Sequence, residues 1–144
     1  MKFQRALLVL VQVFCLLAVA ACSSTIAPFS QRAYEYATDL KVESLSIMNR
    51  AEFPYTENES RVERLKMDLD KAYEFAKGRP RNEHSTRQWE ILIDPEKNLV
   101  GGFFTRWESE GQLNYPFIEQ SQRLISDAFD TVIGLESGKI RLGD

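Results

Sequence analysis

Apolar residues spaced three and four positions apart in residues 57–77 constrain the fold of this chain more than any other feature. On an α-helix they form one continuous stripe, whose members are Val62, Leu65, Leu69, Ala72, Tyr73 and Ala76. Thr56 and Glu59 have the spacing of a capping box at the start of this segment, and Gly78 follows its last residue. The pattern therefore predicts an amphipathic helix, which needs other elements to cover its apolar side.

Two further long segments have the same helical period. Residues 30–51 contain an apolar face formed by Ala33, Ala37, Leu40, Ile47, Met48 and Ala51. Residues 116–135 begin with a proline suited to a first helical turn and carry a stripe of Phe117, Ser121, Leu124, Ala128, Val132 and Leu135, with Ile118, Ile125, Phe129 and Ile133 beside it. The link between the first two predicted helices is short and contains Pro54, so we expect these helices to be antiparallel neighbours.

The region between these helices, residues 78–115, is less regular. A capping-box spacing at Ser85 and Gln88 predicts a short helix that carries Trp89. Asp94-Pro95 has the form of an N-cap followed by proline, and predicts the start of another helix. Gly101-Gly102 then marks either a break in that helix or a point where another helix backbone comes close.

These elements together predict an all-α fold, an antiparallel bundle of about four helices with an irregular middle region. The one strand-like fragment, the sequence ILI at residues 91–93, is too short to found a sheet. Residues 30–144 are expected to form a single helical domain.

The first 21 residues differ in kind from the rest of the chain. Lys2 and Arg5 give a positive start, and no acidic residue occurs before Glu35. Residues 6–21 are apolar except for one glutamine, which is shorter than the roughly 20 residues that a membrane-spanning helix needs. A charged start, an apolar core and an exit rich in small residues predict a secretory signal peptide, and the alternative is a permanent N-terminal anchor helix.

The end of this segment, Val19-Ala20-Ala21-Cys22, resembles the lipobox of bacterial lipoproteins. The resemblance implies cleavage between Ala21 and Cys22, with a diacylglyceryl group on the Cys22 sulfur and an acyl chain such as palmitate on the new N-terminus. Residues 1–21 would be removed, and residues 22–29 would form a lipidated cysteine and a short tether. Two or three acyl chains are enough for stable membrane attachment. Ser23 after the cysteine implies the periplasmic face of the outer membrane rather than the inner membrane.

The mature chain predicted in this way has 123 of the 144 residues, with 16 basic and 21 acidic side chains and a formal charge of −5. This mild acidity gives no reason to expect a nucleic-acid partner. Because Cys15 would leave with the signal and Cys22 would carry lipid, the domain has no disulfide and depends on packing. We expect no cofactor other than the covalent lipid.

Candidate catalytic and metal-binding residues are scarce. His84 is the one histidine of the chain, so zinc sites and histidine-based triads are not expected, and no catalytic residue is assigned. A cell-wall hydrolase that uses a glutamate or aspartate remains the third choice among the functions considered.

A cluster of basic residues at positions 77–87 is the most suggestive local feature. Arg79, Arg81 and Arg87 are candidates for binding an anionic envelope component, such as a lipid headgroup or lipopolysaccharide. The competing interpretation is a positive helix C-terminus that complements the helix dipole and continues as a solvated loop.

The tryptophans Trp89 and Trp107 are candidates for binding a partner, because tryptophan is common among interface anchors. The competing interpretation places them, with Phe103 and Phe104, in the core. The function predicted first is a membrane-anchored, non-enzymatic accessory or adaptor protein that binds an envelope protein. The alternative is a module that binds an anionic envelope component through the basic cluster.

Overall fold

The computed structural model describes residues 27–140, and these residues form an all-α fold without a strand, as predicted. The described chain contains five α-helices rather than about four, and one 3₁₀ turn. Their bounds are α2 (Gln31–Met48), η1 (Tyr55–Glu57), α3 (Glu59–Lys77), α4 (Glu83–Ile93), α5 (Val100–Glu110) and α6 (Tyr115–Glu136). The predicted signal peptide, its cleavage site and Cys22 lie outside the described residues.

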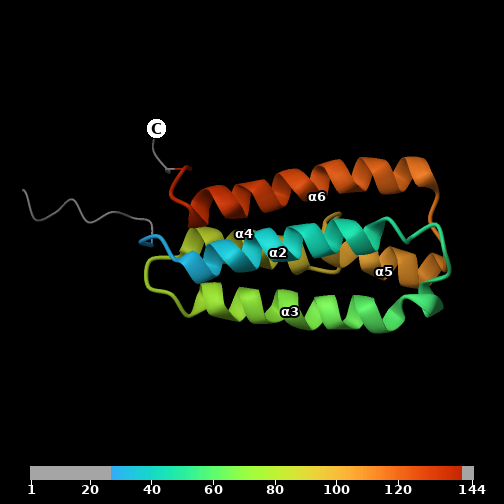
Figure 1. Ribbon diagram of the computed structural model, residues 1–144, viewed down its shortest axis with the longest axis horizontal. Helices are drawn as coiled ribbons and strands as arrows, with labels where there is room; N and C mark the ends of the chain where they lie inside the picture. The colour runs from blue at the N-terminus through green and yellow to red at the C-terminus, as the bar shows by residue number, and fades with distance from the viewer. Residues whose placement is uncertain (1–26, 141–144) are drawn as a thin grey trace, which may run out of the picture.

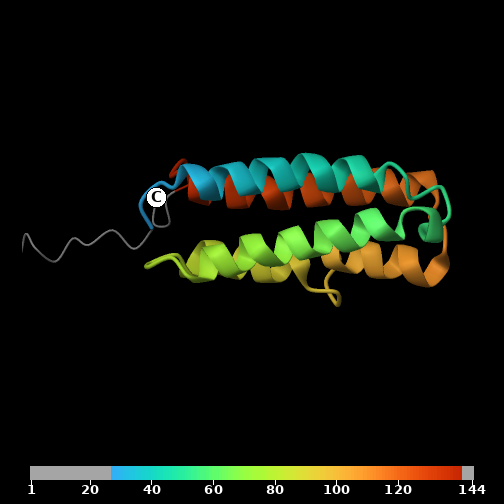
Figure 2. The same cartoon turned by 60° about the horizontal axis from the view of Figure 1, so that its bottom comes forward.

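The helices lie side by side with their axes nearly parallel, and each long helix runs opposite to the one before it (Figures 1 and 2). α2 packs against α3 and α6, and α4 packs against the same two helices from the other side. α4 and α5 follow one another along one side of the bundle, so that five helices occupy four rows. The extra helix therefore comes from a break in the fourth row.

This break does not lie where the sequence pattern predicted it. No helix begins at Asp94-Pro95, because Asp94 is the C-cap of α4 and its carboxylate accepts the backbone N–H of Glu96 at 2.8 Å. Gly101 and Gly102 lie within the first turn of α5 and do not interrupt it. The interval between α4 and α5 folds back against this turn.

The glycine pair permits that close approach. A Cβ atom on Gly102 would lie 1.8 Å from the carbonyl oxygen of Lys97, and one on Gly101 would lie 2.1 Å from that of Ile93. The approaching backbone belongs to the last residue of α4 and to the loop after it, so the close approach of another helix backbone, one of the two alternatives from the sequence, is confirmed at Gly101. Any side chain at these positions would push that backbone away from α5.

Helix starts follow local capping only in part. Ser30 caps α2 and accepts the N–H of Ala33 at 3.3 Å, and Asn114 caps α6 in the same way. The capping box predicted at Thr56 is not formed, because residues 55–57 make a 3₁₀ turn and α3 begins only after Asn58. Ser85, predicted to cap α4, lies instead in its first turn after Asn82.

The core runs along the whole bundle and contains the largest aromatic side chains. Trp89, Trp107, Phe104 and Phe129 are all less than 2 % exposed. The Trp89 ring meets Phe129 edge to face, with ring centroids 6.1 Å apart. The core interpretation of the two phenylalanines, Phe103 and Phe104, is therefore confirmed.

Candidate functional site

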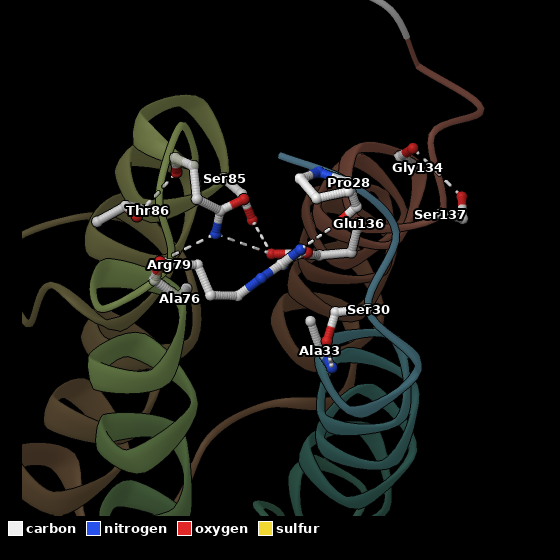
Figure 3. Close-up of polar contacts among 11 residues, drawn as sticks. Pro28, Ser30, Ala33, Ala76, Arg79, Ser85, Thr86, Gly134, Glu136 and Ser137 are labelled. Atoms are coloured by element: carbon white, nitrogen blue, oxygen red, sulfur yellow. Dashed lines mark hydrogen bonds and ion pairs between the residues drawn. The ribbon is translucent and has the colours of Figure 1, made fainter. Parts of the chain in front are cut away.

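A buried carboxylate, that of Glu136, stands at the end of the bundle where the described chain begins. Glu136 is the last residue of α6, and its side chain is 1 % exposed. It is buried because the corner between α3 and α4 and the segment before α2 close over the end of α6 (Figure 3). An unpaired charge in such a place would be strongly unfavourable, so the Glu136 carboxylate needs partners among the side chains around it.

Three side chains donate hydrogen bonds to this carboxylate. Arg79 forms an ion pair with one oxygen through Nη1, and Ser85 donates its hydroxyl to the other. The amide of Asn82 lies 3.3 Å from the same oxygen as Ser85 and also donates to the carbonyl of Ala76 at 3.0 Å. We call Arg79, Asn82, Ser85 and Glu136 the Glu136 network.

The network also reaches the N-terminal segment of the domain. Nη2 of Arg79 donates to the carbonyl oxygen of Pro28 at 2.5 Å, so one guanidinium bridges Glu136 and the residue that leads into α2 (Figure 3). The Arg79 side chain is 13 % exposed. Through these contacts the end of α6, the α3–α4 corner and the segment before α2 are held together.

This arrangement links separate segments of the chain through one carboxylate. An arginine, a serine and an amide occupy three of its roughly four acceptor positions, so Glu136 is fixed to the α3–α4 corner and to the start of α4. Among residues 27–140, no three histidine, cysteine or acidic side chains lie close enough together to hold a metal ion.

The structure places the three predicted anion-binding arginines at this same end but in different settings. Arg79 belongs to the Glu136 network, and Arg87 pairs with Glu90 on the exposed face of α4 at 2.8 Å. Arg81 is exposed in the α3–α4 corner, at a positive φ of 58°, and forms no ion pair within the described residues. The hollow beside them, of about 290 Å³, is lined by Lys77, Arg79, Asn82, Glu83, Thr86, Arg87 and Glu90.

The two predicted partner-binding tryptophans are not at the surface. Trp89 is 1 % exposed and Trp107 is fully buried. The indole N–H of Trp107 donates to the carbonyl of Phe53 at 3.1 Å, which satisfies its polar atom inside the core. A partner that binds the protein in this conformation does not contact either indole ring.

A groove between α5 and α6 is a feature that the sequence analysis missed. It has a volume of about 350 Å³ and is lined by Asn98, Gly102, Phe103, Arg106, Phe117, Gln120, Ser121 and Leu124. The backbone of α5 stands further from α6 than that of α4 does, and aromatic rings fill the space between them. We call this feature the α5–α6 groove.

Two stacked rings form the apolar part of the groove. Phe103 and Phe117 lie nearly parallel, with centroids 6.0 Å apart, and the guanidinium of Arg106 lies 4.2 Å from the centroid of Phe117. Leu124 belongs to the predicted apolar stripe of α6, yet it is 50 % exposed. No feature of the sequence pattern indicates the groove, because periodicity does not show which neighbouring helix stands further away.

Comparison with known proteins adds no relative. No protein family matches this chain, and neither a curated protein nor a solved structure is found to be similar to it. None of the helices in residues 27–140 is both long enough and apolar enough to cross a membrane.

Proposed function

We propose that this chain is a non-enzymatic accessory or adaptor protein of the bacterial cell envelope. In this proposal lipid on Cys22 anchors it to the membrane, with the periplasmic face of the outer membrane favoured, and the α5–α6 groove binds an envelope protein. The observation that carries the proposal is the position of the groove. It lies in the half of the bundle that is remote from Pro28, where the chain enters (Figure 1).

The length of α6 gives the scale of this separation. With a rise of about 1.5 Å per residue, Leu124 lies about 18 Å and Phe117 about 28 Å along the helix from Glu136. A bundle anchored through residues before Pro28 would therefore present the groove well away from the lipid attachment point. An anchored adaptor gains from this geometry, because attachment raises its effective concentration at one surface while its binding site stays accessible.

The chemistry of the groove indicates the kind of partner. The exposed side of Leu124 and the partly exposed ring of Phe117, above the buried ring of Phe103, suit an apolar anchor residue. The amides of Asn98 and Gln120 at the rim can hydrogen-bond to the backbone of a protein segment. A protein segment with one apolar anchor matches this mixture of a small apolar floor and a polar rim.

Site-directed crosslinking in intact cells tests the partner. A photo-crosslinking residue in place of Leu124 should trap a defined envelope protein. The same residue in place of Met67 is the matched control, because Met67 is also an exposed apolar residue, 56 % exposed, but lies on α3. Recovery of the same background proteins from both positions would refute the assignment of the groove.

The anchor has a test of its own. The mass of the mature chain should show cleavage before Cys22 and acyl chains on that residue. Cys22→Ala should leave an uncleaved precursor without lipid. Normal processing and membrane retention of that variant would contradict the anchor.

A further inference from the structure

Exposed apolar side chains gather at the end of the bundle where the described chain begins. Phe29 is 62 % exposed, Ile140 is 38 % exposed and Tyr34 is 37 % exposed. The rings of Phe29 and Tyr34 lie 6.4 Å apart, and Ile140 folds back on the end of α6, where its backbone N–H donates to the carbonyl of Gly134 at 3.0 Å and its side chain lies over that glycine. We call residues 27–36, 74–90 and 136–140 the basal end (Figures 1 and 2).

Charge is distributed unequally between the basal end and the rest of the bundle. The basal end carries six basic and five acidic side chains, whereas the remaining described residues carry nine basic and fifteen acidic ones. Three of the five acids, Glu74, Glu90 and Glu136, are paired with basic side chains of the same end. The basal end therefore has a formal charge of +1, whereas the remaining described residues sum to −6.

Three basic side chains of the basal end form no ion pair within the described residues. They are Arg32, Arg81 and Lys139, and all three are exposed. They lie on three separate segments of the basal end: Arg32 in the first turn of α2, Arg81 in the α3–α4 corner and Lys139 next to Ile140. Apolar side chains flanked by unpaired cations are the combination with which peripheral proteins bind anionic bilayers.

We propose that the basal end lies on the membrane and binds the anionic headgroups of phospholipids such as phosphatidylglycerol. This inference rests on the proposed lipid anchor. Five residues lie between Cys22 and Pro28, and the six steps from one Cα atom to the next span at most about 22 Å. Because Arg79 holds the carbonyl of Pro28, the basal end faces the bilayer and the α5–α6 groove points away from it.

In this proposal the lipid anchor attaches the chain to the membrane, and the basal end determines how the bundle is oriented on the bilayer. A basic residue close to an anionic surface contributes about 1 kcal/mol, which corresponds to about a fivefold change in the ratio of docked to undocked bundles. Phe29 and Ile140 add apolar area that enters the interfacial region. Removing two of the unpaired cations should therefore lower the docked ratio about 25-fold, while the chain stays on the membrane.

The test uses the lipidated full chain in vesicles of phosphatidylethanolamine and phosphatidylglycerol. A polarity-sensitive fluorophore is attached to a cysteine that replaces Ile140, or to one that replaces Tyr115 at the opposite end. Nitroxide-labelled lipid should quench the fluorophore at position 140 and not the one at position 115. Replacing phosphatidylglycerol with zwitterionic lipid should weaken this quenching.

Charge removal supplies the matched comparison. Arg81→Gln with Lys139→Gln should abolish most of the quenching at position 140. Arg61→Gln with Arg64→Gln, which removes two exposed side chains of the same total charge from the remote end of α3, should leave it unchanged. Equal quenching at positions 140 and 115, or equal effects of the two sets of substitutions, would overturn the inference while leaving the adaptor proposal intact. An unmodified Cys22 in the mass spectrum would overturn both.

Discussion

Arg79→Met is the substitution that tests the Glu136 network most directly. It removes the cation that faces a carboxylate which is 1 % exposed, together with the bond to the carbonyl of Pro28. Asn82 and Ser85 can still donate to Glu136, but neither carries a charge. Breaking a buried ion pair from one side costs about 3–5 kcal/mol, and we expect a loss of free energy of unfolding in this range.

The structure also predicts an order among the variants. Glu136→Met should cost less, about 1–3 kcal/mol, because the guanidinium of Arg79 is 13 % exposed and can reach water when its partner is lost. The double variant should be more stable than Arg79→Met alone, because it leaves no buried charge behind. Arg87→Met is the matched control, since the Arg87–Glu90 pair is exposed and such pairs contribute about 0–1 kcal/mol.

Urea unfolding of residues 23–144, followed by circular dichroism and by the fluorescence of the two buried tryptophans, measures these differences. The four free energies of the cycle give the coupling between Arg79 and Glu136. Additive losses in the double variant, or a loss in Arg79→Met no larger than that in Arg87→Met, would refute the assignment of a buried ion pair at this end of the bundle.

Three further predictions concern other parts of the domain. Gly102→Ala should lower the free energy of unfolding by about 1–3 kcal/mol, although alanine normally favours a helix, because its Cβ would meet the carbonyl of Lys97; a gain in thermal stability would contradict the close approach. Ser44→Ala should raise stability by about 1 kcal/mol in urea unfolding, because the Ser44 hydroxyl is buried without a partner; an unchanged midpoint would contradict this. Burial raises the pKa of the Tyr55 phenol, so the stability that this group contributes is complete below about pH 10 and is lost as pH rises through the raised pKa. Tyr55→Phe should therefore make the free energy of unfolding fall less steeply with pH above about pH 10. An unchanged dependence on pH would count against a raised pKa of the Tyr55 phenol.

Long periodic segments were predictable from the sequence because their apolar residues must all face one core. α2, α3 and α6 each lie within three residues of the expected bounds, and most stripe residues of α2 and α3 are buried. In α6 the expected stripe was wrong in part: of its members only Val132 and Leu135 are buried, and the core side is completed by the neighbouring positions Ile118, Ile125 and Phe129. Local signals were less reliable. The dipeptide Asp94-Pro95 is compatible both with the start of a helix and with a turn. The turn forms here because the backbone around it packs against Gly101 and Gly102, and a local sequence pattern does not contain such contacts.

The candidate site shows the same limit more sharply. The sequence located the basic cluster, but the partner of Arg79 lies 57 residues further along the chain. Glu136 directly follows the apolar residue Leu135 at the end of a helix, where a glutamate is usually solvated. Whether such a carboxylate is buried depends on how the α3–α4 corner closes over it, which is a property of the tertiary arrangement.

The two ends of the bundle are closed by different chemistry, and this difference suits an anchored adaptor. At the remote end, backbone bonds from Leu113 to Ala51 and from Tyr55 to Gly111, both 2.8 Å, tie the helix connections together and keep α5 in place beside the groove. At the basal end, the bond from Arg79 to Pro28 connects the entering chain to the Glu136 network. A pull on the proposed tether would therefore act on α3, α4 and α6 together instead of peeling α2 from its neighbours. Because Arg79 is the side chain that bonds to Pro28, Arg79→Met should loosen residues 27–30 while the α5–α6 groove keeps its shape.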